Sequence, residues 1–196
     1  PLNFTGIVFH ESRCGSTLVA NTLIAMDPAR HRVYSESPPP VSALKVCGDD
    51  YERCGMDQAA ALLKDVLYMM GRTNDPTEER VFFKIQSIGT RNLNVFQRAF
   101  PSTPWIFVYR DPVQVMMSHL GGGSSRGGSK ARNANCVRPQ QSSTPVRVVE
   151  RVVSKYSGGS HVKARDLSYQ DYCAVHLASL TETALQYMTN DNSSSD

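Results

Sequence analysis

The stretch VFHESRCGSTLVANTL, from Val8 to Leu23, contains a short apolar run, a turn of small and hydroxyl residues, and then a helical pattern. A strand, a tight loop and a helix in this order present backbone N–H groups to a phosphate at the helix N-terminus. The usual nucleotide-binding loop ends in Gly-Lys-Ser/Thr, whose lysine reaches the terminal phosphates and whose hydroxyl holds magnesium. Here Arg13 precedes Gly15 and no cation follows it, so the loop suits an oxyanion transferred without a metal.

Four short runs are typical of strands, namely Thr5–His10, Arg32–Glu36, Val81–Ile85 and Trp105–Tyr109. The last two are almost continuously apolar, which is typical of strands covered by helices on both faces. Helical spacing predicts helices over three ranges, Ser16–Met26, Met56–Met70 and Arg91–Phe100. We therefore expect an α/β fold in which helices flank a parallel sheet.

Ligands of parallel sheets bind in a crevice beyond the carboxyl ends of the strands. Polar residues follow the predicted strands at these ends. They are Ser12, Glu36, Gln86 and Arg110. We therefore expect these four residues to lie at one crevice.

The chain has 196 residues, of which 40% are hydrophobic and 20% charged, as expected for one globular domain over residues 1–196. The net charge of +3 is too small to indicate nucleic acid as a partner. No apolar run is long enough to cross a bilayer, and the N-terminus lacks the pattern of a signal peptide. Because the chain starts at Pro1, we expect a soluble fragment of a longer protein, incomplete at its C-terminus.

Residues 121–145 are rich in Gly, Ser, Asn and Gln and contain no acidic residue, which predicts a disordered insertion. A short segment, Val146–Val153, follows it, and a final helix is predicted from about Tyr169 to Met188, with a capping box at Ser168. The five cysteines are widely spaced, without a Cys-x-x-Cys pair or zinc-finger spacing. We expect free thiols and no metal site.

A second motif lies in WIFVYRDPVQVMMSHL, where Arg110 ends a buried strand, Pro112 begins a helix and Ser118 follows Arg110 by eight residues. Together with the opening loop it resembles a known family. SRCGSTL resembles the 5′-phosphosulfate loop of sulfotransferases that use 3′-phosphoadenosine 5′-phosphosulfate (PAPS), and VYRDPVQVMMSHL is similar to their 3′-phosphate motif. The resemblance covers Thr5 to Leu120 and implies a P-loop nucleotide-hydrolase-like sulfotransferase fold.

The resemblance also implies roles for individual residues. Arg13 would contact the bridging oxygen and the sulfonate, and Arg110 and Ser118 would bind the 3′-phosphate. The residues implied at the 5′-phosphate are Cys14, Gly15, Ser16 and Thr17. PAPS would be the sulfonate donor, and no metal cofactor is implied.

A base must take the proton of the acceptor hydroxyl. In FFKIQS, Lys84 matches the family's lysine and would either stabilise the departing nucleotide or only close a strand. Gln86 stands where the cytosolic branch has its catalytic histidine. Other branches place a glutamate after the first helix, and VYSESPPP offers Glu36 there. Glu36 is therefore the candidate base, while His10 and His119 are expected to be structural.

The sequence thus predicts a PAPS-dependent sulfotransferase, an enzyme that transfers a sulfonate to a hydroxyl, or an amine, of an unidentified acceptor. Two alternatives stay open. Gln86 and the lack of the family's C-terminal Gly-rich nucleotide loop favour a degenerate, non-catalytic nucleotide-binding module, and a small-molecule kinase of related fold is the third interpretation. The compartment is open as well, either the cytoplasm or the Golgi lumen.

Overall fold

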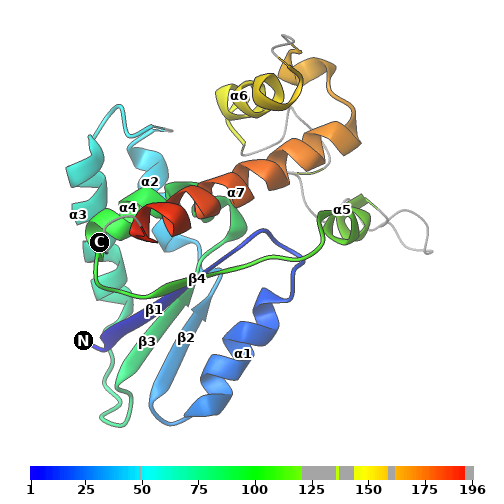
Figure 1. Ribbon diagram of the computed structural model, residues 1–196. Coiled ribbons are helices and arrows are strands. Elements are labelled where there is room, and N and C mark those ends of the chain that lie inside the picture. Colours follow the sequence, from blue (N-terminus) through cyan, green and yellow to red (C-terminus); the bar gives the residue numbers. More distant parts are fainter. Residues whose placement is uncertain (49, 121–135, 137–143, 159–161, 193–196) are drawn as a thin grey trace, which may run out of the picture.

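The computed structural model describes residues 1–48, 50–120, 136, 144–158 and 162–192 (Figure 1). Four parallel strands form one sheet in the order β2-β3-β1-β4. Their bounds are Asn3–His10 for β1, His31–Ser35 for β2, Arg80–Lys84 for β3 and Trp105–Val108 for β4. The predicted helix-flanked parallel sheet is therefore confirmed. The first residue of each strand is within two positions of the predicted one.

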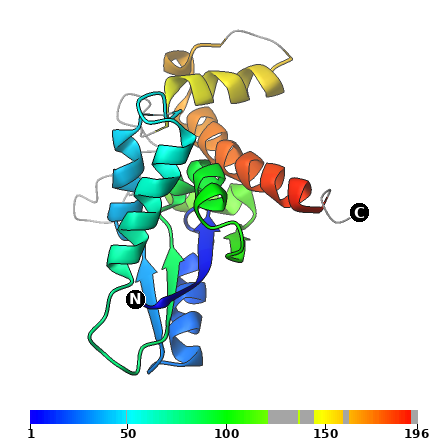
Figure 2. The same ribbon diagram turned by 90° about the vertical axis from the view of Figure 1, so that its left-hand side faces the viewer.

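Helices cover both faces of the sheet. Helix α1 (Ser16–Met26) lies on one side of the strands and α3 (Met56–Met70) on the other (Figure 2). The main core fills the space between the sheet and α3 together with α4 (Leu93–Ala99). Its buried side chains include Ile7, Phe9, Leu63, Leu67, Phe83 and Phe96. The apolar runs of β1 and β3 thus form a sheet buried by helices, as parallel sheets require.

No helix was predicted at α2 (Pro39–Val46), which begins within three consecutive prolines, Pro38 to Pro40, and proline is typical of strand ends. Proline at the first turn of a helix loses no hydrogen bond, since the N–H groups there have no partner within the helix. A 3₁₀ helix, η1 (Ser87–Asn92), precedes α4 and packs closely on α2. A Cβ at Gly89 would overlap the side chains of Val41 and Ile85. The predicted helix over Arg91–Phe100 is therefore shorter than expected, because Arg91 and Asn92 belong to η1 and α4 covers Leu93–Ala99.

Three further helices lie beyond the carboxyl ends of the strands. Helix α5 (Pro112–Leu120) follows β4, and α7 (Tyr169–Asn192) crosses above the sheet with α6 (Val146–Tyr156) packed against it (Figure 1). A short 3₁₀ helix, η4 (Ala164–Asp166), precedes α7. The predicted capping box is present, since the Asp171 N–H donates to Ser168 Oγ at 3.1 Å. Within the described residues, no helix is long and apolar enough to span a membrane.

The expectation of five free thiols is wrong. Cys47 bonds to Cys54 and Cys136 bonds to Cys173, which leaves Cys14 as the free cysteine. The second bond joins residues 37 positions apart, a pairing set by the tertiary fold that spacing does not reveal. Cys136 also falls inside the predicted insertion at 121–145, most of which lies outside the described residues.

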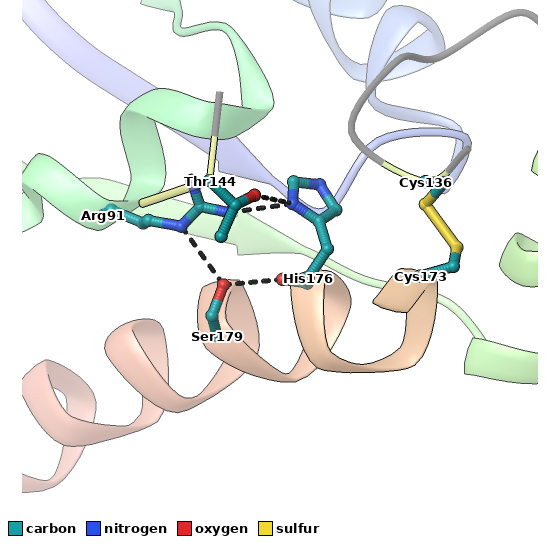
Figure 3. The surroundings of a disulfide bond; sticks show 6 residues. All are labelled: Arg91, Cys136, Thr144, Cys173, His176 and Ser179. Atoms are coloured by element: carbon teal, nitrogen blue, oxygen red, sulfur yellow. Dashed lines mark hydrogen bonds between the residues drawn. A yellow bond between two sulfur atoms is a disulfide. The ribbon is translucent and has the colours of Figure 1, made fainter. Parts of the chain in front are cut away.

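A buried polar network lies beside the second disulfide and fixes α7 in place (Figure 3). The Arg91 guanidinium donates to Ser179 Oγ at 3.1 Å, to Thr144 Oγ1 at 2.9 Å and to His176 Nδ1 at 2.8 Å. Burial, with the charge of Arg91, holds the pKa of His176 well below its usual value. His176 is therefore a neutral acceptor that ties α7 to η1.

Candidate active site

The loop between β1 and α1 has an unusual backbone. Ser12, Arg13 and Gly15 have φ angles of 74°, 53° and 93°, all in the left-handed region that favours glycine. A hydrogen bond from the Ser12 N–H to His10 Nδ1, at 3.0 Å, supports this conformation. Non-glycine residues adopt such angles at a cost, and they occur often at ligand-binding turns.

The loop leads into the N-terminus of α1 without a side-chain cap. The first N–H groups of a helix have no partner within the helix, and together with the helix dipole they attract anions. Arg13, Gly15 and Thr17 are exposed, whereas Ser16 is buried and Cys14 is half-buried. Burial raises the pKa of the Cys14 thiol, so it stays neutral and does not repel an anion. The residues predicted at the 5′-phosphate thus form a loop with an accessible helix N-terminus.

The two sequence motifs meet at one hydrogen bond. Arg13 Nε donates to Ser118 Oγ at 3.0 Å, although the residues lie 105 positions apart. Ser118 lies in α5, which starts two residues after Arg110. The Arg110 guanidinium is exposed and donates from Nε to Gln114 Oε1 at 2.8 Å. Among the described residues, no carboxylate forms an ion pair with Arg13 or Arg110, so neither positive charge has a counter-ion there.

Glu11 is a site residue that the sequence did not suggest. Its buried carboxylate accepts the Arg110 N–H on Oε1 at 2.6 Å and the Thr181 hydroxyl of α7 on Oε2 at 3.4 Å. Burial raises the pKa of Glu11. This residue connects the ends of β1 and β4 to α7 and thereby fixes the backbone from which the Arg110 side chain extends. An acidic residue at the end of an apolar strand is the signal that was overlooked.

The candidate base lies at the same edge of the sheet. Glu36 follows β2, is about half exposed and has a φ of 55°. Its Oε1 forms an ion pair with Nζ of Lys84, which ends β3 and is only 1% exposed. An ion pair with lysine requires the carboxylate form of Glu36, which is the form that can accept a proton.

His10 completes this cluster from β1. Its Nε2 lies 3.5 Å from Glu36 Oε1, and its Nδ1 accepts the Ser12 N–H. Burial and the charge of Lys84 lower the pKa of His10 to about 4, although Glu36 and the backbone of Ile85 oppose this shift. His10 is therefore neutral at physiological pH and connects the phosphate loop to the candidate base.

The other expected residues have lesser places in the site. Gln86 is half-buried at the start of η1, and its carbonyl accepts the Gly89 N–H at 2.7 Å. His119 is buried beside Arg13, and burial together with that charge lowers its pKa to about 4. Neither His119 ring nitrogen has a hydrogen-bond partner among the described residues. His119 is thus an uncharged neighbour of the Arg13–Ser118 pair.

The comparisons with known proteins give no match, either to a family model or to a curated protein or a solved structure. Within the part of the chain that the structure describes, no group of three or more His, Cys, Asp or Glu residues could hold a metal ion. A functional interpretation of this chain therefore depends on its own residues. These are the N-terminus of α1 with Arg13 and Arg110, which form no ion pair within the described residues, and a cluster of Glu36, Lys84 and His10.

Proposed function

We propose that the chain is a PAPS-dependent sulfotransferase with the P-loop-like fold of that family. The observation that carries the proposal is the hydrogen bond from Arg13 Nε to Ser118 Oγ at 3.0 Å. PAPS carries phosphate groups at its 5′ and 3′ positions, so its binding requires two anion sites at a fixed separation. The hydrogen bond supports the interpretation that the two motifs serve one nucleotide.

In this proposal, the N-terminus of α1 binds the 5′-phosphate through its backbone N–H groups, from Cys14 and Gly15 onwards, with the hydroxyls of Ser16 and Thr17. Arg110 and Ser118 bind the 3′-phosphate. The Ser118 hydroxyl can do so while bonded to Arg13, because it accepts from Arg13 Nε and keeps its own O–H to donate. The free terminal nitrogens of Arg13 then contact the bridging oxygen and the sulfonate.

The proposed reaction is an in-line transfer. The acceptor oxygen forms a bond to sulfur while the bond from sulfur to the 5′-phosphate oxygen breaks. Glu36 takes the proton of the acceptor, and Lys84 and Arg13 stabilise the charge on the departing oxygen. Sulfuryl transfer resembles phosphoryl transfer in its loose transition state, so correctly placed donors supply most of the catalysis. The products are 3′-phosphoadenosine 5′-phosphate (PAP) and the sulfated acceptor.

One alternative has an observation in its favour. Lys84 occupies Glu36 Oε1, and Gln86 cannot act as a base, which suits a nucleotide-binding module without turnover. The kinase alternative has less support, because no cation follows Gly15 to reach a terminal phosphate.

Calorimetric titration with PAP, ADP and ATP tests the proposal. We expect PAP to bind most tightly, and Arg110→Ala to remove this preference. Arg98→Ala is the matched control, because Arg98 is an exposed arginine on α4 that pairs with exposed Asp57. Equal or absent binding of the three nucleotides would contradict the proposal, while PAP binding without hydrolysis of PAPS would favour the non-catalytic module.

The disulfides bear on the compartment. Stable disulfides form in oxidising compartments and are rare in the cytoplasm. Two disulfides therefore favour the Golgi lumen over the cytoplasm as the place where this domain works.

A further inference from the structure

His10 lies between the loop after β1 and the Glu36–Lys84 pair of the candidate site. Its side chain is buried at the carboxyl end of β1, and the two ring nitrogens face different partners. Nδ1 accepts the N–H of Ser12, in the phosphate loop, at 3.0 Å. Nε2 lies 3.5 Å from Oε1 of Glu36 and makes no hydrogen bond of normal geometry among the described residues.

These contacts fix the tautomer of the ring. A backbone N–H can only donate, so Nδ1 of His10 must be without a proton. The neutral ring therefore carries its hydrogen on Nε2, the nitrogen that lies 3.5 Å from Glu36 Oε1. Because Nε2 already holds a proton and Nδ1 is engaged, His10 cannot take the proton of the acceptor itself.

The Glu36 carboxylate is held at one oxygen only. Lys84 and His10 both face Oε1, and Oε2 has no partner among the described residues. A carboxylate fixed at Oε1 presents Oε2 as the oxygen that can receive a proton. In the proposed reaction, Lys84 also stabilises the charge on the departing oxygen. When Lys84 does so, the Nε2–H of His10 is the donor that remains for Glu36 Oε1.

We infer that His10 is a positioning residue that aligns the Glu36 base through Nε2–H and sets the phosphate loop through Nδ1. This inference rests on the proposed function, since it assigns a task to Glu36 in the proposed transfer. It gives His10 two separable contributions, one to turnover and one to nucleotide affinity.

Two substitutions separate these contributions. His10→Asn keeps an acceptor near the place of Nδ1 and removes the donor that faces Glu36. His10→Gln keeps an N–H near the place of Nε2 and removes the acceptor for Ser12. Turnover is measured as hydrolysis of PAPS, with water in place of the acceptor, and affinity as calorimetric binding of PAP.

We expect His10→Asn to hydrolyse PAPS about tenfold more slowly and to bind PAP within about threefold of the wild type. His10→Gln should bind PAP about tenfold more weakly and lose less of its rate at saturating PAPS. Equal losses in both variants, or a wild-type rate in His10→Asn, would overturn the inference. A wild type that fails to bind PAP would instead remove the proposed function itself.

A measurement on the unmodified protein keeps the inference testable if a variant does not fold or the wild type does not hydrolyse PAPS. Nitrogen NMR of histidine-labelled protein reports which ring nitrogen carries the hydrogen. We expect the Nε2–H tautomer at His10 at neutral pH, with and without PAP. A hydrogen on Nδ1 would overturn the inference.

Discussion

Arg13 and Ser118 lie 105 positions apart, yet Arg13 Nε donates a hydrogen bond of 3.0 Å to Ser118 Oγ. The parallel sheet makes this contact possible, because β1 and β4 are neighbours and both end at the same edge. The loop after β1 carries Arg13, and α5, which follows β4, carries Ser118. The loop after β1 and the second motif therefore lie side by side.

Removal of the Ser118 hydroxyl tests this single site. We expect Ser118→Ala to weaken PAP binding about tenfold to a hundredfold, because a hydrogen bond to a charged phosphate is lost and Arg13 loses its acceptor. Ser118→Thr keeps the hydroxyl and is the matched control, with only a small cost in helix propensity. Calorimetry measures both affinities. Equal binding by the alanine and threonine variants would remove Ser118 from the nucleotide site.

Arg13 should contribute more to turnover than to binding. PAP lacks the sulfonate and keeps the former bridging oxygen as one oxygen of its 5′-phosphate, which the N–H groups of the loop would also bind, so Arg13→Ala is expected to weaken PAP binding less than tenfold. PAPS hydrolysis should fall about a hundredfold or more, the usual loss when a donor to a developing oxyanion is removed. Arg98→Ala again serves as the surface-arginine control. A parallel decrease in affinity and rate would indicate that Arg13 only binds the nucleotide.

Much of the fold could be predicted because its signals are local. The bounds of α1 and α3 agree with the sequence prediction, since each helix has helical spacing of apolar residues and starts directly after a glycine. The run at Val81 also predicted a largely buried parallel strand correctly. The run at Trp105 forms a parallel strand as predicted, but this strand lies at the edge of the sheet and is not buried, with Ile106 48% exposed. Helix α2 was missed because prolines can end a strand and also begin a helix, and only the packing at Gly89 distinguishes these outcomes.

Part of the candidate site could also be predicted, because the order of strands and loops determines where the strand ends lie. Residues at the ends of parallel strands must lie near one another, which brought Arg13, Glu36 and Arg110 to one edge. The contribution of Glu11 depends on burial and on a hydrogen bond from Arg110, 99 positions away, and that of His10 on burial and on its approach to Glu36. The acidic residue at the strand end indicates the position of Glu11 but not these partners. The disulfide between Cys136 and Cys173 was missed for the same reason.

Glu36→Gln separates the base from the binding site. We expect PAPS hydrolysis to be lost and PAP affinity to stay within about threefold, because Glu36 is assigned no contact with the nucleotide. The same variant leaves buried Lys84 without its counter-ion, which should lower the free energy of unfolding by about 1–3 kcal/mol. Glu79→Gln is the control, because Glu79 is similarly exposed and pairs with exposed Arg30. Normal hydrolysis by Glu36→Gln would exclude Glu36 as the base.

His119 should make the protein sensitive to acid. The pKa of His119 is about 4 in the fold and 6.5 in an unperturbed histidine, so the unfolded chain binds more protons between these values and stability decreases as the pH falls. His10 acts in the same direction, whereas Glu11, whose pKa is raised, opposes it. We expect His119→Met to be as stable as the wild type at pH 7.5 and to lose about 2 kcal/mol less by pH 5. Urea unfolding at both pH values measures this, and an identical pH dependence of the two proteins would contradict it.

The two disulfides should differ in their effect on stability. In the chain-entropy account, the bond that spans 37 residues, Cys136–Cys173, contributes about 4 kcal/mol, and the bond that spans seven, Cys47–Cys54, about 2.5 kcal/mol. We expect the double variant Cys136→Ser/Cys173→Ser to unfold at a lower urea concentration than Cys47→Ser/Cys54→Ser. Loss of the longer bond also releases α7, which carries Thr181, so PAP affinity should fall with it.

Thiol labelling gives the independent check on this pairing. With two disulfides and free Cys14, alkylation of the denatured, unreduced chain should modify one thiol, and alkylation after reduction should modify five. Protein made in an oxidising compartment is required, because the cytoplasm keeps thiols reduced. Five reactive thiols before reduction would show that the bonds do not form. All five cysteines, including Cys14 in the loop after β1, would then be free thiols open to oxidation. The argument from disulfides for a luminal enzyme would lose its support.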